Sequence, residues 1–173
     1  MTQTITPAPV RRSISVKAPP ERAFEVFTSR IGAWWPKSHH IGAAEPQTVV
    51  IEPREGGRWF ERAPDGAECD LGRVLAWEPP TRLLLAWQIT AEWTFDPELV
   101  TEVEVRFTPE GEGRTRVELE HRNLERFGER AEAVRAAIGA PNGWTAILEL
   151  FAKAADARFF LSNLSPERGE RDE

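Results

Sequence analysis

The sequence predicts an α+β fold in which a curved antiparallel sheet of about seven strands wraps around one long C-terminal helix. Two observations lead to this prediction. Residues 143–163 are apolar with helical periodicity, and short runs with strand alternation occupy most of the chain between residues 47 and 121. No other stretch is long and apolar enough to cover so wide a sheet, so wrapping the sheet around this helix is the economical arrangement.

The stretch 143–163 places its charges on one narrow stripe when it is turned at about 100° per residue. The opposite face is expected to lie against the sheet, because a helix that is apolar over most of its circumference needs a wide partner. That face holds Trp144, Ile147, Phe151, Ala154 and Arg158. The small Ala154 leaves room beside the helix. Arg158 either reaches solvent near the helix end or marks a polar point of a cavity, since an unpaired buried charge is costly.

The N-terminal part of the chain predicts one strand and one helix. Residues 1–9 form a flexible leader, and residues 10–17 alternate as a strand does. A Pro-Pro pair ends this strand and presets a backbone angle suited to a helix start, so a short amphipathic helix is expected at 21–29. The next segment, 31–42, is too rich in glycine and proline for a regular element.

Further strands are predicted downstream, separated by the turn signals PREGG, APDG, EPPT and PEGEG. They occupy residues 47–52, 57–62, 70–77, 82–88, 99–107 and 114–121. The last two strands alternate between apolar and charged residues, which predicts a sheet with one face covered and the other in water. Strand parity also places four residues of one strand on a common face: Leu71, Arg73, Leu75 and Trp77.

A short helix at 129–138 precedes the long one, and residues 164–173 are polar enough to predict a disordered tail. The element order is therefore β-α-β6-α, within a single domain at 10–163. At 173 residues the chain is long enough for one substantial core.

Composition excludes several classes of function. The formal net charge of −6 argues against nucleic acid or an anionic membrane as partner, and no run is long enough to insert into a membrane. The single cysteine, Cys69, cannot form an internal disulfide and no apolar signal core is present, so a cytoplasmic location is expected. No phosphate loop, nucleophile triad or metal-ligand spacing occurs, so neither a metal nor a cofactor is predicted.

Six segments carry a family resemblance. In chain order they are VKAPPERAFEVFT, WWP, EPREGGRWF, GRVLAWEPPTRLLLAW, EVEVRFTPEGEGRTRVELEH and GWTAILELFA. Together they resemble the START-like (SRPBCC, helix-grip, Bet v 1-like) superfamily, and within it the bacterial proteins similar to the activator of Hsp90 ATPase (AHSA1). The resemblance implies a sheet that grips the last helix, with a ligand-sized cavity between them. It implies no reaction, because members include lipid carriers, hormone receptors, aromatase/cyclases and co-chaperone domains.

The resemblance places a ligand between the concave sheet and the apolar face of the last helix. The candidate contact residues on the helix are Trp144, Ile147, Phe151 and Ala154. The further walls are Trp34, Trp35, Trp87 and Phe107, and the polar anchors are Arg158, His121 or His39. Tryptophan suits such a wall because it combines a large apolar surface with one N–H donor.

The histidines leave alternatives open. His39 and His40 are adjacent, and adjacent side chains of an extended loop point in opposite directions, so the pair is not predicted to bind a metal. One of the two is expected over the cavity entrance, unless both are solvated. His121 continues an inward-facing row, where it would either contact the ligand or be a satisfied core histidine.

Binding of a small apolar or amphipathic molecule, without catalysis, is the favoured function. The alternative is a polyketide cyclase/hydratase-type enzyme in the same cavity, which needs His121 or His40 as a general base. A third hypothesis is an Hsp90-type co-chaperone or interaction module, which needs an exposed complementary patch. No residue pattern supports a chaperone contact, and the chain is expected to act as a monomer or a homodimer.

Overall fold

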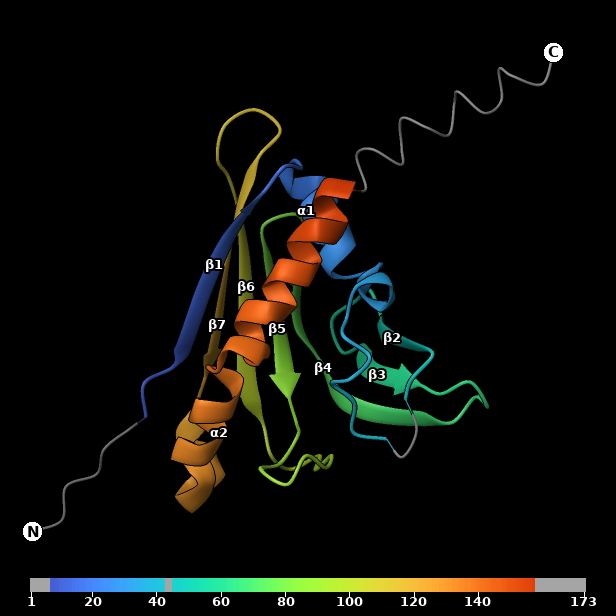
Figure 1. The fold of residues 1–173 in the computed structure, drawn as a ribbon, viewed down its shortest axis with the longest axis vertical. Helices are drawn as coiled ribbons and strands as arrows, with labels where there is room; N and C mark the ends of the chain where they lie inside the picture. The colour runs from blue at the N-terminus through green and yellow to red at the C-terminus, as the bar shows by residue number, and fades with distance from the viewer. Residues whose placement is uncertain (1–6, 43–44, 158–173) are drawn as a thin grey trace, which may run out of the picture.

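The computed structural model describes residues 7–42 and 45–157, and it confirms the predicted fold class (Figure 1). The chain begins with β1 (Val10–Val16), α1 (Pro20–Phe27) and the short helical turn η1 (Ile31–Ala33). The strands that follow are β2 (Thr48–Ile51), β3 (Arg58–Arg62), β4 (Glu68–Glu78), β5 (Arg82–Trp87), β6 (Thr101–Pro109) and β7 (Thr115–Arg122). The last elements are η2 (Leu124–Arg130), α2 (Ala131–Ile138), η3 (Pro141–Thr145) and the C-terminal helix, described over residues 146–157.

Some predictions fall outside the described residues. These are the first six residues of the predicted leader, the predicted tail at 164–173, the last part of the predicted helix and Arg158. Within the described part of the chain, no helix has the length and apolar character needed to cross a membrane.

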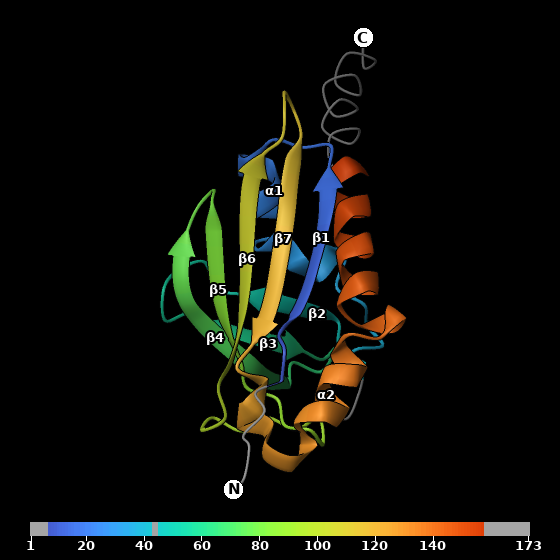
Figure 2. The same ribbon diagram turned by 90° about the vertical axis from the view of Figure 1, so that its left-hand side faces the viewer.

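The seven strands form one antiparallel sheet with the order β1-β7-β6-β5-β4-β3-β2. Strands β2 to β7 follow one another as a meander, and β7 then pairs with β1. In Figure 1 the sheet curves around the C-terminal helix, which is drawn in orange to red. Figure 2 shows β6, β7 and β1 side by side, with α2 below the C-terminal helix.

The two faces of the sheet differ as the alternation predicts. The apolar residues of β6 are buried on the concave face. On the convex face, Glu104 forms ion pairs with Arg82, Arg106 and Arg122. Burial opposes ionisation of Glu104, but hydrogen bonds from Arg82 and Arg122 outweigh it and hold the pKa of this carboxyl below its usual value. The convex face is therefore covered by paired charges.

Strand β4 departs from the predicted parity because it contains two register shifts. Its pairing with β3 skips Leu71, and its pairing with β5 skips Leu75. Each extra residue of this kind reverses the faces of the side chains beyond it and bends the strand. Leu71 is buried whereas Arg73 is exposed, and Trp77 packs on Phe24 of α1 with ring centroids 5.0 Å apart. The prediction that Leu71, Arg73, Leu75 and Trp77 share a face is therefore wrong.

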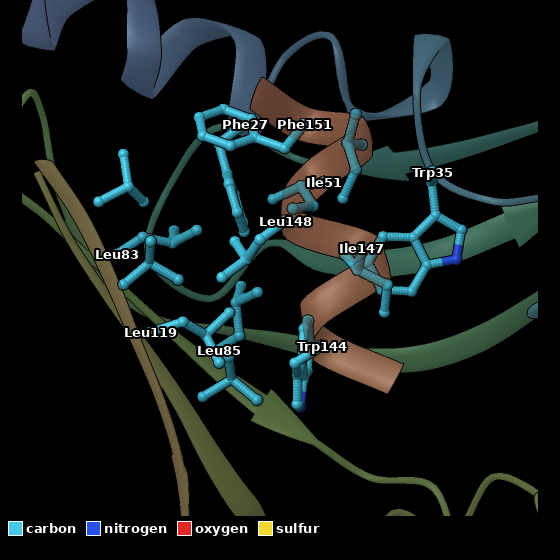
Figure 3. Packing of buried hydrophobic residues seen from close by; sticks show 14 of the residues in the cluster. Phe27, Trp35, Ile51, Leu83, Leu85, Leu119, Trp144, Ile147, Leu148 and Phe151 are labelled. Atoms are coloured by element: carbon cyan, nitrogen blue, oxygen red, sulfur yellow. The ribbon is translucent and has the colours of Figure 1, made fainter. Parts of the chain in front are cut away.

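The part of the concave face near α1 is filled by apolar side chains, among them Phe27 and Phe151 (Figure 3). Phe151 of the C-terminal helix is fully buried, with ring centroids 5.1 Å from Phe27 and 5.5 Å from Trp34. Phe27 also lies 6.0 Å from the ring of Phe107 in β6. The indole of Trp34 donates to the carbonyl of Val26 at 2.7 Å, so its polar atom is satisfied inside this core. These side chains interdigitate as a hydrophobic core does.

Candidate ligand pocket

A pocket of about 390 Å³ lies at the opposite end of the concave face, where the C-terminal helix begins. Its walls come from the loop at 35–41, from β4 and β5, from the turn at 89–93 and from the segment 137–147. The lining is mainly apolar, and its polar part consists of Ser38, His39, His40 and Asn142. No aspartate, glutamate, lysine or arginine is among the described residues that line it. No group of His, Cys, Asp and Glu able to hold a metal ion occurs in the described part of the chain.

Four tryptophans pack edge to face in a closed ring at the floor of this pocket. The centroid distances are 5.8 Å for Trp35–Trp59, 5.8 Å for Trp59–Trp87, 5.6 Å for Trp87–Trp144 and 6.2 Å for Trp144–Trp35. Three of these side chains line the pocket, while Trp59 is buried and supports them. Edge-to-face contacts at these distances are favourable. The floor is therefore formed before any ligand arrives.

His121 holds one member of this ring from behind. Its Nδ1 accepts a hydrogen bond from the indole N–H of Trp144 at 3.1 Å. An indole can only donate, so the proton of the neutral imidazole is on Nε2, which donates to Oγ1 of Thr101 at 2.9 Å. The ring is fully buried, and burial lowers the pKa of His121 to about 3. With both nitrogens occupied, His121 is a neutral, satisfied core histidine and does not line the pocket.

The loop that carries the other two histidines turns back on itself. The backbone N–H of His39 donates to the carbonyl of Pro36 at 3.0 Å, and the indole of Trp35 donates to the carbonyl of His39 at 3.2 Å. The assumption of an extended loop is wrong, because the chain turns here. Both His39 and His40 line the pocket, whereas the sequence placed one of the pair over its entrance or both in solvent.

His39 connects this loop to the start of the C-terminal helix. Its Nε2 lies 2.8 Å from the carbonyl oxygen of Asn142, and its Nδ1 lies 3.1 Å from Oγ of Ser38. A carbonyl can only accept, so in the neutral ring Nε2 donates to Asn142 and Nδ1 accepts from Ser38. Both ring nitrogens of His39 are therefore occupied.

A buried carboxylate fixes the far end of the loop. Glu61 of β3 is 3% exposed, and it accepts the backbone N–H groups of Ile41 at 3.1 Å and of Gly42 at 2.7 Å. A Cβ at position 42 would lie 2.7 Å from Oε1 of Glu61, so a larger residue here would push the carboxylate away from the backbone N–H groups that it binds. The carbonyl of Gly42 in turn lies 2.9 Å from Nδ1 of His40. Glu61 therefore orients the segment that presents His40.

Trp93 stands at the mouth of the pocket with 46% of its surface exposed. Its φ of +65° lies in the left-handed region, which bulky side chains rarely adopt. The turn is held by the N–H of Trp93 bonding to the carbonyl of Thr90 at 2.9 Å and by the N–H of Thr90 bonding to Thr94 at 2.7 Å. Strain of this kind gathers at ligand sites.

The structure divides the predicted contact residues between pocket and core. Those that line the pocket are Trp35, His39, Trp87, Trp144 and Ile147. Those buried in the core are Trp34, Phe107, His121 and Phe151, while Ala154 packs at the core's edge. The space beside Ala154 is thus not part of this pocket. Trp93 and the wall at 137–143 were not predicted as parts of the site. The one local signal near that wall is the sequence Pro141-Asn142-Gly143, which marks a helix start and indicates no ligand.

The curved sheet, the enclosed helix and the pocket at its open end define a helix-grip protein. The model of the family described as "Activator of Hsp90 ATPase homolog 1-like protein" matches residues 17–156. The chain therefore belongs to this family.

Solved structures extend the comparison. An anthrahydroquino-gamma-pyrone synthase, Txn09, complexed with SUM is 41% identical over 86% of this chain and 97% of its own, with a TM-score of 0.60. CalC, a self-sacrificing resistance protein from Micromonospora echinospora, is 31% identical over 87% of this chain and 96% of its own, with a TM-score of 0.65. Protein MLL2253 from Mesorhizobium loti, 24% identical over 86% of this chain and 97% of its own with a TM-score of 0.60, shares the fold. No curated protein matches the chain.

Proposed function

We propose that this protein binds a small, uncharged, flat aromatic molecule in the pocket at the start of its C-terminal helix. The observation that carries the proposal is the lining: Trp35, Trp87, Trp93 and Trp144 face the space, and no charged side chain lies among its described walls. Indole rings stack well on other aromatic rings. A charged ligand would lose its hydration here without gaining a counter-charge.

The ligand also has a polar edge in this proposal. The hydroxyl, imidazole and amide groups of Ser38, His39, His40 and Asn142 supply hydrogen-bonding atoms to an otherwise apolar wall. A few polar groups in an apolar cavity are typical of small-molecule sites, which fix orientation in this way. The ligand is therefore amphipathic rather than a plain hydrocarbon.

The name of one relative supports an aromatic ligand. The relative with 41% identity is named as an anthrahydroquino-gamma-pyrone synthase, a name that describes fused rings. That protein was also solved as a complex. We carry over the class of ligand and not the particular compound, because the walls of the pocket determine which ring system fits.

Catalysis of a ring closure is a second candidate function. Two observations favour it: one relative is a synthase, and a titratable side chain, His40, faces the pocket. A general base must reach the proton that it removes. His121, the other base considered, lies behind Trp144 with both nitrogens bonded and does not meet this condition.

A co-chaperone role has less support. It needs a contiguous exposed apolar patch. Among the described large apolar side chains, the exposed ones are Trp93, which lines the pocket mouth, and Leu150. The exposure of Trp93 is explained by binding of a small ligand, because its side chain lines the pocket.

The test is to fill the pocket and measure binding of anthraquinone by quenching of tryptophan fluorescence. Ala137→Phe places a ring at the pocket wall, and Ala136→Phe is the matched control, since both alanines are exposed on the same helix but only Ala137 lines the pocket. We expect the first variant to lose at least about tenfold in affinity and the second to bind like the wild type. Tighter binding of a fatty acid than of anthraquinone would overturn the proposal.

A further inference from the structure

We propose that His40 recognises a hydroxyl group on the ligand, accepting its hydrogen at Nε2, so that the pocket selects phenols among flat aromatic molecules. The inference rests on the proposed function. It adds the class of ligand, phenols, and the residue that distinguishes this class, His40. It follows from the hydrogen bonds that surround the three histidines of the chain.

The first step is the position of the proton on His40. Nδ1 lies 2.9 Å from the carbonyl oxygen of Gly42, which can only accept a hydrogen bond. In the neutral imidazole the proton is therefore on Nδ1. The lone pair is then on Nε2, because a neutral ring carries one donor and one acceptor nitrogen.

The second step is that this lone pair is free. Nε2 of His40 has no hydrogen-bond partner among the residues that the structure describes, although the side chain is half-buried and lines the pocket. Both nitrogens of His39 and both nitrogens of His121 are occupied. In the described part of the chain, His40 is thus the histidine that offers an acceptor to a ligand.

The third step is that the acceptor is held in place. Glu61 accepts a hydrogen bond from the backbone N–H of Gly42 at 2.7 Å. The backbone carbonyl of Gly42 in turn accepts one from Nδ1 of His40. The loop is also connected to Asn142 through His39. A hydrogen-bonding group that is positioned before binding loses little entropy when the ligand arrives. Glu61 therefore acts as a positioning residue for His40.

The consequence is discrimination between ligand groups. An unprotonated nitrogen attracts a hydroxyl hydrogen but repels the lone pairs of a carbonyl or an ether placed at the same point. The surrounding wall is apolar, so the difference is larger than it would be in water. If the pocket also closes rings, the same contact moves a proton: the ligand O–H bond breaks, Nε2 binds the proton, and the oxygen keeps the electron pair. Attack of this oxygen on a carbonyl carbon of the same ligand then breaks the C=O π bond, and its electron pair moves to the carbonyl oxygen, which takes the proton back from Nε2.

The experiment compares anthraquinone with 1- and 2-hydroxyanthraquinone on the wild type and on His40→Phe, which keeps a ring of similar size but has no acceptor. We expect the preference for the better hydroxylated isomer over anthraquinone to fall about tenfold in the variant, the worth of one hydrogen bond. Lys37→Ala, a change at an exposed position of the same loop that does not line the pocket, should keep the wild-type preference. His40→Ala is measured in the same way if His40→Phe does not fold.

The outcomes separate the inference from the function on which it rests. An unchanged hydroxyl preference in the His40 variants overturns the inference while leaving aromatic binding intact. Equal binding of anthraquinone and both hydroxylated isomers by the wild type overturns it as well. If the wild type binds none of the three compounds, the proposed function itself fails and the inference falls with it.

Discussion

The indole N–H of Trp144 donates a hydrogen bond to Nδ1 of His121, with the two nitrogens 3.1 Å apart in the interior. This bond connects the segment that starts the C-terminal helix to strand β7, and it sets the angle of one wall of the pocket. It requires a neutral imidazole, because a protonated ring would carry a hydrogen on Nδ1 facing the indole hydrogen. The pocket therefore depends on the charge state of a residue that does not line it.

The first prediction concerns stability at low pH. The pKa of His121 falls from its ordinary 6.5 to about 3 in the folded protein, so between these values the unfolded chain binds more protons and stability decreases as the pH falls. Between pH 7 and pH 4 the free energy of unfolding of the wild type is expected to fall by about 3 kcal/mol more than that of His121→Gln, whose side chain cannot titrate. Urea unfolding followed by tryptophan fluorescence measures the difference. Parallel losses in the two proteins would contradict it.

The second prediction concerns the loop that holds the histidines. In Glu61→Gln, the amide oxygen can accept a hydrogen bond from one of the two backbone N–H groups, of Ile41 or Gly42. The amide NH₂ group then faces the other N–H, and two donors cannot bond to each other. We expect a loss of about 1–2 kcal/mol in the free energy of unfolding and a weaker affinity for hydroxylated anthraquinone. Glu55→Gln, at an exposed position, is the control and should change neither quantity. A destabilised Glu61→Gln protein with wild-type affinity would show that the loop is not needed for binding.

The third prediction concerns the mouth of the pocket. Trp93→Gly removes the exposed indole and also the strain of a bulky residue at positive φ. The affinity for anthraquinone should fall about tenfold, since one stacking contact is lost, while the free energy of unfolding should not decrease. The control is Glu92→Ala, a change in the same turn as Trp93 that removes only an exposed ion pair with Arg130, and it should bind normally. Unchanged affinity in Trp93→Gly would assign Trp93 a role outside the pocket.

Much of the fold could be predicted because periodicity is a local property. The alternation along β6 and β7 indicated which face of the sheet is covered, and the apolar face of the last helix indicated what covers it. Burial of Phe151 and Trp144 followed from the same pattern. The periodic segments and the turn signals between them predicted the order of the elements, and the structure confirms that order.

The position of the pocket could not be predicted in the same way. The sequence places Phe151 and Trp144 on the same face of one helix, yet in the structure Phe151 is enclosed by Phe27 and Trp34 while Trp144, in η3, lines the pocket. The difference arises from what α1 and the loop after it place against each turn of the helix. Parity failed in β4 for a related reason: the register shifts depend on pairing with neighbouring strands, which no single strand specifies.

The sequence by itself determined that a curved sheet encloses the C-terminal helix, because burial of apolar surface follows a period that each element carries alone. Only the tertiary structure decided that the pocket lies beside Trp144 and that His121 is buried behind this tryptophan. It also decided that His40 turns Nε2, with its lone pair, toward a ligand. Those facts depend on contacts between segments far apart in the chain, such as Glu61 with Gly42 and His39 with Asn142. Hydrogen bonding and packing between distant segments determine the protonation and exposure of each group.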